Sequence, residues 1–523
     1  MNSAEKDVIG QETELKLLLM KEIDPDQVWN HPAIADFLAE TPISEILVST
    51  YFDTRDYRLL KNGLTYRIRK ENKQWIATVK SMGSAAGGLH QREEWNMVLP
   101  DEKPRPEEFN EEAVRIKLLS LIDDQLLVPL LKTHFKRTKA IWKDHEHNEI
   151  EIALDQGEII TTVKSQPISE IELEIKHGKD QKVLLELGIV LSEQIPMIPG
   201  ETSKFQRGLK LIGLKPSDKR SKRTKKRMPG KPENKTMGRM VPFILEIAFQ
   251  DVMEYFYLLH QEKAGKEYVH QIRVKIRKLR ALLSFFKPII HADHYQMLKN
   301  ELRDIAGQLT PLRELDVMKL HFDQFQKELK ARNSNTSTDR LQRMLDRSLQ
   351  KEREKINKTL FSGKLTPCAL RILKQIHSFE MNAHAESILL SDFIPRRMEK
   401  WMDQFRAVSA RSEIFDTAAM HRLRIQVKKI RYVTESMGSM IPHMTGKTIN
   451  MLKELQDYLG ELHDIQCERQ RMKEWMTAEL PDVILMTQAG IYEGWQQNRE
   501  YQIRKDLQES WRRAIKIERK RNQ

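Results

Sequence analysis

The sequence predicts a multidomain protein in which an N-terminal antiparallel β domain with a few helices is followed by a C-terminal all-α domain. Residues 1–214 contain short stretches that alternate polar and apolar side chains, a period typical of strands with one buried face. From about residue 240 to the end, apolar residues recur every three or four positions, as they do along a helix. A length of 523 residues also exceeds what one ordinary hydrophobic core accommodates.

The composition is that of a soluble protein: 40% of the residues are hydrophobic, 31% are charged and the mean hydropathy is −0.59. No apolar run approaches the ~20 residues that a membrane helix requires. The N-terminus lacks the basic and apolar regions of a signal peptide, so we expect a cytoplasmic protein with no membrane partner. The two cysteines, Cys368 and Cys467, neither staple a fold nor form a CxxC metal motif.

The positive charge is concentrated in one short stretch. Between Lys215 and Arg239 there are eleven Lys or Arg and two acids, so nine of the thirteen net positive charges lie here. The stretch lacks apolar periodicity and predicts an exposed linker between two domains, 1–214 and 240–523. It is most simply a solvated spacer. The alternative is an extra contact for a polyanion, and nucleic acid is not favoured because no base-stacking aromatic patch is evident.

Charged residues alternate along several strands of the β domain. Glu12, Glu14 and Lys16 share one face of the first strand, and the leucines between and after them share the other. Later strands repeat this pattern with Glu-x-Glu pairs, which place two oxygen donors about 7 Å apart on one face. Such pairs suit Mg²⁺ or Mn²⁺, and neighbouring Arg or Lys side chains suit phosphate oxygens.

An antiparallel sheet with one solvated face explains any single strand of this kind. Several such strands together favour a closed sheet, whose interior would be a charged tunnel wide enough for a chain of phosphates. The chain contains no GxxxxGK[ST] nucleotide-binding motif. Chemistry in the tunnel would therefore rest on stabilisation of phosphate charge by cations, without a covalent nucleophile.

Six motifs of this region, in their order along the chain, resemble those of the CYTH family of triphosphate tunnel metalloenzymes. They are ExExK at 12–16, YFDT at 51–54 followed by NGLTYRIR, TVK ending at Lys80, ALDQG around Asp155, EIELE from Glu170 and SKFQRG at 203–208. The resemblance spans about residues 8–214. It implies an eight-stranded antiparallel barrel whose tunnel binds a triphosphate with one or two ions of Mg²⁺ or Mn²⁺.

The resemblance also implies roles for individual residues. Those implied to bind substrate phosphate are Lys16, Arg67, Arg69, Lys80, Arg92, Arg137, Lys204 and Arg207. Those implied to hold metal are Glu12, Glu14, Asp155, Glu170 and Glu172. The implied catalytic residues are Glu12, Glu14, Lys16, Glu170 and Glu172, with Glu94, Glu151 and Glu174 as further members of the site. Gly10 stands where many relatives have His, which leaves the metal and phosphate sets intact.

The helical half contains the same motif twice. HQIRVKIRKLR begins at His270 and HRLRIQVKKIR begins 151 residues later, at His421. A second element, LTPLRELDV from Leu309, returns as LGELHDIQC from Leu459. This half is therefore predicted to be a duplicated helical bundle. Its prolines are expected to mark helix breaks, at Pro242, Pro288, Pro311, Pro367, Pro395, Pro442 and Pro481.

Each copy of the motif places a basic stripe opposite an apolar one. At about 100° per residue, four basic residues of the first copy fall within about 80° of arc: His270, Arg273, Arg277 and Arg280. One such stripe is usually the solvated side of a helix, but two related stripes favour a shared anionic ligand. The histidines lack a second ligand one turn away, which disfavours metal binding there.

This pattern resembles the CHAD domain over about residues 240–520. The resemblance implies a polyphosphate ligand that contacts His270, Arg273, Lys275, Arg277, Arg280, His421, Arg424, Lys428 and Arg431. Thr310 and Pro311 interrupt a family element in the first copy and predict a local kink.

Three functions remain open from the sequence. The residues favour a metal-dependent triphosphatase, a phosphoanhydride hydrolase that acts on inorganic triphosphate or short polyphosphate while the helical domain binds polyphosphate. The second is a non-catalytic polyphosphate scaffold, and association with polyphosphate granules is expected in either case. The third is a triphosphatase or cyclase acting on a nucleotide, an RNA 5′ end or thiamine triphosphate. Phosphate-binding residues cannot separate these substrates, because they do not contact the part that differs.

Overall fold

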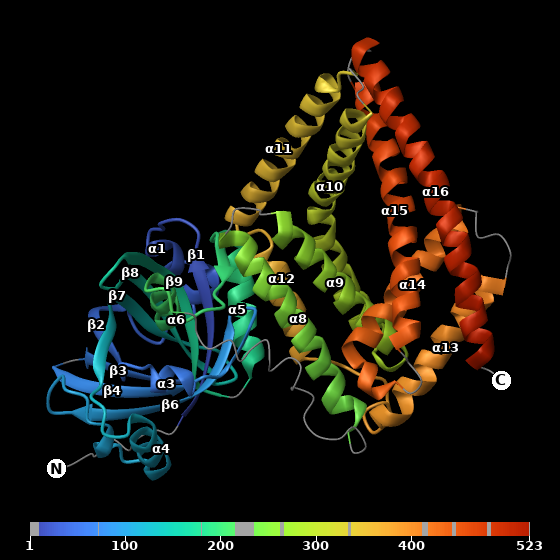
Figure 1. The fold of residues 1–523 in the computed structure, drawn as a ribbon. Helices are drawn as coiled ribbons and strands as arrows, with labels where there is room; N and C mark the ends of the chain where they lie inside the picture. Colours follow the sequence, from blue (N-terminus) through green and yellow to red (C-terminus); the bar gives the residue numbers. More distant parts are fainter. Residues whose placement is uncertain are drawn as a thin grey trace. The chain divides into compact units, whose positions relative to one another are not determined.

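The computed structural model describes residues 10–71, 73–178, 180–214, 235–261, 266–332, 336–410, 417–441, 446–478 and 483–521 (Figure 1). The chain divides into two compact units. The first comprises Met1–Gly230 with Thr359–Ser378, and the second comprises Lys231–Lys358 with Phe379–Gln523. We call them the barrel unit and the helical unit. Most of the predicted linker, 215–234, lies outside the described residues, and its last three residues already belong to the first helix of the helical unit.

The barrel unit is an eight-stranded antiparallel barrel, as predicted. Its strands are β1 (Gly10–Leu19), β2 (Ile43–Asp53), β3 (Leu64–Glu71), β4 (Gln74–Ser81), β6 (Leu89–Leu99), β7 (Val128–Lys143), β8 (Glu149–Ile160) and β9 (Ser165–His177). They pair in the order β1-β9-β8-β7-β2-β3-β4-β6, and β6 pairs with β1 to close the barrel. Two short strands, β5 (Ser84–Ala86) and β10 (Met197–Pro199), pair with β6 and β1.

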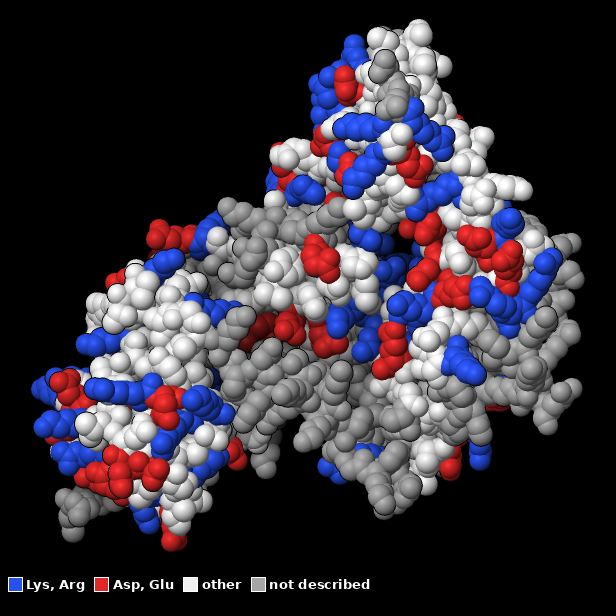
Figure 2. Space-filling view, viewed as in Figure 1, with Lys and Arg blue, Asp and Glu red and all other residues white. Residues whose placement is uncertain are grey.

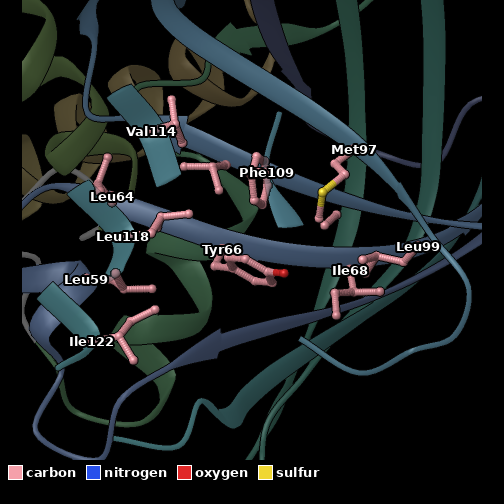
Figure 3. Close-up of a cluster of buried hydrophobic side chains, with 12 residues drawn as sticks. Leu59, Leu64, Tyr66, Ile68, Met97, Leu99, Phe109, Val114, Leu118 and Ile122 are labelled. Carbon is pink, nitrogen blue, oxygen red and sulfur yellow. The ribbon is translucent and has the colours of Figure 1, made fainter. Parts of the chain in front are cut away.

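The alternation of side chains separates a polar interior from an apolar exterior. On β1, Glu14 and Lys16 point inward, whereas Leu15 and Leu17 are fully buried on the outside. The outer face of β3, β4 and β6 carries a cluster of buried apolar side chains around Tyr66, which η1 (Pro106–Glu108) and α4 (Glu112–Ile122) cover (Figure 3). Burial of this face favours one register, because a shift of one residue would turn every charge outward.

The helices between the barrel strands are short. α1 (Asp26–Trp29) and α2 (Pro32–Ala35) follow β1, and α4 ends at Ile122. Asp123 and Asp124 adopt positive φ angles of 47° and 57°, which end the helix before β7 begins. The remaining helices are α3 (Arg58–Lys61), α5 (Gln181–Gln194) and α6 (Lys204–Leu211).

The helical unit is all-α and duplicated, as predicted. Its described helices are α8 (Met237–Gln261), α9 (Lys266–Phe286), α10 (Ala292–Ala331), α11 (Asp339–Phe361), α13 (Leu390–Ala410), α14 (Thr417–Met437), α15 (Gly446–Ala478) and α16 (Val483–Arg521), with the 3-10 turns η3 (Lys287–Ile289) and η4 (Gly438–Met440). The repeated motif lies on α9 and α14, which pack against each other. α9 also packs between α8 and α10, and α14 packs between α13 and α15. None of the described helices is both long and apolar enough to cross a membrane.

Three of the prolines expected to break helices do not. Pro242, Pro311 and Pro395 lie inside α8, α10 and α13. At Pro311 the helix continues through both Thr310 and the proline, so the predicted interruption is absent. The flanking Leu309 and Leu312 are buried in the core, and this burial favours continuation of the helix over the hydrogen bond that proline removes. Pro288 lies in η3 and Pro367 opens a helix, as expected, while Pro442 and Pro481 fall outside the described residues.

One helix of the C-terminal half belongs to the barrel unit. α12 (Thr366–His377) lies within Thr359–Ser378 and packs on α5. The division into units therefore does not follow a single boundary along the sequence.

Candidate functional site

The interior of the barrel contains a cavity of about 640 Å³ with a nearly balanced set of charges. Nine Lys or Arg and eight Glu side chains line it. The cations are Lys16, Arg67, Arg69, Lys80, Arg92, Arg137, Lys139, Lys176 and Lys204, and the acids are Glu12, Glu14, Glu45, Glu71, Glu94, Glu151, Glu172 and Glu174. A cavity with this lining can bind an extended polyanion only if the polyanion replaces the carboxylate partners of the cations.

An apolar plug fills one part of the interior. Phe205 and Leu209 of α6 pack with Tyr51, Leu131 and Phe135 of the barrel wall. A capping box fixes the start of α6: the Ser203 hydroxyl accepts from the backbone N–H of Gln206, whose side chain accepts from the Ser203 N–H. Lys204, the first residue of α6, is thereby held at the boundary between plug and cavity, with its Nζ 5.0 Å from the Phe135 ring centre.

Three carboxylates and one lysine form the most buried group of charges. Oxygens of Asp155, Glu170 and Glu172 lie within 4.8 Å of one another, an arrangement that could hold a metal ion. Lys204 Nζ lies between them, 2.7 Å from Asp155 Oδ2, 2.9 Å from Glu172 Oε1 and 2.5 Å from Glu170 Oε1. Glu170 is fully buried, and its other oxygen lies 3.1 Å from Arg207. Three clustered carboxylates whose negative charge is balanced by Lys and Arg could take a divalent cation in place of those side chains.

The pairing register of β7, β8 and β9 brings these carboxylates together. Asp155 on β8 pairs with Glu170 on β9, and Arg137 on β7 pairs with Asp155. The Arg137 guanidinium donates to both oxygens of Asp155 at 2.7 Å and to Glu172 at 2.5 Å. Burial would raise the pKa of Glu172, but Lys16, Lys204 and Arg137 hold it well below its usual value. Glu172 is therefore ionised at neutral pH and available as a ligand.

A second group surrounds Glu12 and Glu14 on β1. Lys80 donates to both oxygens of Glu12 at 2.9 Å, and Arg92 bridges Glu12 and Glu14. Lys16 connects the two groups, because its Nζ lies 3.6 Å from Glu14 and 2.7 Å from Glu172. Burial would raise the pKa of Glu12, but Lys80 and Arg92 keep it well below its ordinary range.

Arg67 and Arg69 form the wall with the least compensated positive charge. Arg67 donates to Thr78, and Arg69 donates to Ser49 and, at 3.0 Å, to Glu71. Burial, together with Arg67 and Arg137, lowers the pKa of Arg69 to about 10. An anion placed here would relieve this repulsion.

The structure thus brings nearly all the sequence-predicted barrel residues to one cavity. Asp155, Glu170 and Arg207 lie behind its lining, where Arg207 is 3.1 Å from Glu170. The sequence analysis missed two cations, Lys139 and Lys176. Both continue the period-two rows that it used, since Lys139 follows Arg137 on β7 and Lys176 follows Glu174 on β9.

Not every motif residue faces the cavity. Tyr51 of YFDT lines it, but Asp53 is buried away from it and accepts the backbone N–H groups of Thr54, Leu59 and Leu60. Asp53 therefore fixes the turn into α3 that joins β2 to β3, a structural role.

The predicted basic residues of α9 and α14 divide into two sets. Arg273, Arg277, Arg424 and Lys428 interact electrostatically as neighbours, with Asp464 of α15 beside them. Burial and the nearby Arg424 and Arg277 lower the pKa of Lys428 to about 7. By contrast, Lys275 is 3.1 Å from Asp251, and Arg431 pairs with Glu435 and Gln456. Figure 2 shows Lys and Arg side chains gathered in a hollow of the helical unit between α10 and α15.

The remaining members of the predicted set surround these four. Burial and the charges of Arg313 and Arg277 lower the pKa of His270, and the His421 ring centre lies 5.9 Å from that of His463. Arg280 lies near Lys429. Arg313 is a further basic neighbour that the sequence analysis did not include, although it belongs to the repeated LTPLRELDV element.

Comparisons with known proteins match the two units separately. A family model described as the CYTH domain matches residues 10–209, and one described as the CHAD domain matches residues 256–473. The chain is 33% identical over 215 residues to the inorganic triphosphatase of Haemophilus influenzae. The aligned region covers 40% of this chain and 57% of that protein. The chain thus spans little more than half the length of this curated relative.

Two solved structures are similar in part. A Hippeastrum protein described as having a dominant triphosphatase activity is 18% identical, with a TM-score of 0.28, and the match covers 39% of this chain and 96% of that chain. The CHAD domain from the plant Ricinus communis is 18% identical, with a TM-score of 0.42, and the match covers 53% of this chain and 93% of that chain.

Proposed function

This chain belongs to the proteins that join a CYTH domain to a CHAD domain, and on that premise we propose that its barrel hydrolyses inorganic triphosphate or short polyphosphate with Mg²⁺ or Mn²⁺. The helical unit, in the same proposal, binds long-chain polyphosphate. The relative from Haemophilus influenzae, named as an inorganic triphosphatase, supports the choice of substrate.

One observation carries the proposal for the barrel: its buried cations are paired with its buried carboxylates. Lys16, Arg137 and Lys204 all contact Glu172, so a phosphate chain must compete with this carboxylate for them. A divalent cation that takes Glu172 and its neighbours as ligands would release those cations toward phosphate. Metal and triphosphate should therefore bind with positive cooperativity.

The residues of the chain have separable roles in this scheme. Asp155, Glu170 and Glu172 would hold the metal ion, which supplies Lewis-acid neutralisation of phosphate charge and an activated water. Arg67 and Arg69 would bind phosphate oxygens from the opposite wall and stabilise the charge that develops as the anhydride bond breaks. The plug around Phe205 would limit how far a phosphate chain can enter.

For the helical unit, the supporting observation is the crowding of Arg273, Arg277, Arg424 and Lys428. Crowded cations with too few acidic partners gain stability from a polyanion, because each phosphate relieves repulsion and releases counterions. Burial lowers the pKa of Lys428 to about 7, and repulsion from Arg424 and Arg277 adds to this effect.

The proposed function is tested by phosphate release from the full chain with Mg²⁺ or Mn²⁺. Inorganic triphosphate, long polyphosphate, ATP, thiamine triphosphate and RNA with a 5′-triphosphate are offered separately. We expect inorganic triphosphate to give the highest kcat/KM. Faster turnover of an organic triphosphate would identify that compound as the substrate, and no release from any compound would favour a binding scaffold.

Two cavity cations are expected to respond differently to replacement by Ala. Arg69→Ala relieves repulsion among arginines, so the KM for triphosphate should rise with little loss of stability. Lys204→Ala leaves three buried carboxylates without their shared cation. This change should lower the free energy of unfolding of the metal-free protein by about 3–5 kcal/mol. Thermal unfolding with and without Mg²⁺ measures this difference. Equal destabilisation of both variants, with unchanged KM for Arg69→Ala, would assign both residues to the fold alone.

A further inference from the structure

The part of the C-terminal half that packs on the barrel, Thr359–Ser378, approaches the strand that carries Glu14 and Lys16. Its helix α12 packs on α5, and Gly188 of α5 lies close to both α12 and β1. A Cβ on Gly188 would lie 3.1 Å from Leu370 of α12 and 2.5 Å from Leu15 of β1. The outer side of β1 is therefore covered by α5, which α12 covers in turn.

The same segment also fixes the short strand β10. The Thr366 hydroxyl, which is fully buried, donates to the Met197 carbonyl at 2.6 Å. Gly363, at φ +69°, lies so close that a Cβ there would be 2.7 Å from the Met197 nitrogen. A side chain at this position would be excluded both by the backbone angle and by the contact.

β10 in turn fixes the part of β1 that enters the cavity. Met197, Ile198 and Pro199 pair with Leu19, Leu18 and Leu17. Directly after β10, the Gly200 N–H donates to the Lys16 carbonyl at 2.9 Å, and a Cβ on Gly200 would lie 2.8 Å from Cγ of Lys16. The Lys16 side chain is thus confined against this backbone as it extends to Glu172.

The chain returns to the helical unit immediately after the segment ends. The His291 N–H donates to the Glu380 carbonyl at 3.2 Å, and the Asn382 N–H donates to the Ile289 carbonyl at 2.9 Å. Residues 380–382 are therefore anchored beside η3, which directly follows α9 and its basic residues. Thr359–Ser378 is held in the barrel unit by its own contacts, and the residues that follow it are held in the helical unit.

We propose that Thr359–Ser378 is a brace for the catalytic tunnel, in which Thr366 and Leu370 act as positioning residues that hold β10 and β1 so that Glu14 and Lys16 keep their places in the cavity. The kinetic part of this inference rests on the proposed triphosphatase function; the structural part does not. A barrel fragment that ended before residue 240 would lack Thr359–Ser378 and therefore the brace.

The test uses full-length variants and hydrogen–deuterium exchange. Thr366→Val removes the hydroxyl, Thr366→Ser retains it, and Leu370→Ala opens a gap against α5. Leu345→Ala is the matched control, because Leu345 is a fully buried leucine of α11 in the helical unit. We expect Thr366→Val and Leu370→Ala to speed exchange roughly tenfold in peptides covering 14–20 and 196–201, with no change in β3 and β4. Thr366→Ser and Leu345→Ala should leave these peptides unchanged.

The kinetic measurement separates positioning from simple support. We expect Thr366→Val to lower kcat/KM for triphosphate roughly three- to tenfold, and Thr366→Ser to restore it. Unchanged exchange at 14–20 and 196–201 would overturn the proposal, and so would faster exchange with unchanged kcat/KM in an active enzyme. Faster exchange in a protein whose wild type hydrolyses no triphosphate would leave the brace standing and refute the proposed activity.

Discussion

Replacing Glu170 by Gln is expected to lower triphosphate turnover roughly a hundredfold or more, because it removes one of the three clustered carboxylates proposed to hold the metal ion. The fold should survive, since Gln has nearly the volume of Glu and Lys204 keeps Asp155 and Glu172 as ion-pair partners. Phosphate release at saturating triphosphate and circular dichroism measure the two effects. Chelation by EDTA should abolish wild-type turnover, and Mg²⁺ or Mn²⁺ should restore it.

A matched control and a binding measurement make this test independent of turnover. Glu93→Gln lies on the exposed side of β6 and should change nothing. Added Mg²⁺ should raise the unfolding temperature of wild-type protein but raise that of Glu170→Gln much less. Undiminished wild-type turnover in EDTA would contradict the metal-dependent mechanism.

The second large effect is expected in the helical unit. Changing Arg273, Arg277, Arg424 and Lys428 together to Gln should weaken binding of long-chain polyphosphate by about a hundredfold or more, because four crowded cations are lost. The full chain is used because α12 packs within the barrel unit. Titration with polyphosphate of defined length, at two salt concentrations, measures the affinity and its salt dependence.

The control removes the same charge from a different helix. Arg343, Arg347, Lys351 and Lys355 form an exposed row on α11, and their replacement by Gln should change affinity little. Equal loss of affinity in both quadruple variants would show that binding follows net charge alone. The repeated motif would then be the solvated side of a bundle.

The sequence predicted the barrel and its charged interior because polar and apolar side chains that alternate with a period of two identify a strand and also the face of it that points inward. In β9, one row of acids and the apolar row between them identify both the strand and its inward face, and the register then follows from burial. Lys139 and Lys176 were missed although the same rows contain them. The apolar plug was missed because Tyr51, Phe135 and Phe205 are far apart in sequence and have no shared local pattern.

Other features depend on tertiary contacts that no local pattern encodes. α12 has the apolar spacing of any amphipathic helix, and nothing in that spacing says that it packs on the barrel. The prolines inside α8, α10 and α13 are tolerated because packing of the surrounding helix outweighs the single hydrogen bond that each removes. Of the basic residues on α9, only contacts distinguish Lys275, which pairs with Asp251, from Arg273.

Inside the barrel, the carboxylates of the protein act as counterions of its buried cations, as in an ion exchanger. Lys16, Arg137 and Lys204 already have carboxylate partners, so a phosphate chain displaces protein groups there and few ions from solution. The crowded cations of α9 and α14 have Asp464 and Glu314 as nearby acids and must draw further counterions from the solvent. On the proposed function, added salt should therefore weaken polyphosphate binding to the helical unit steeply while affecting the tunnel much less. Ionic strength would then shift the balance between binding a long polymer and cleaving a short one.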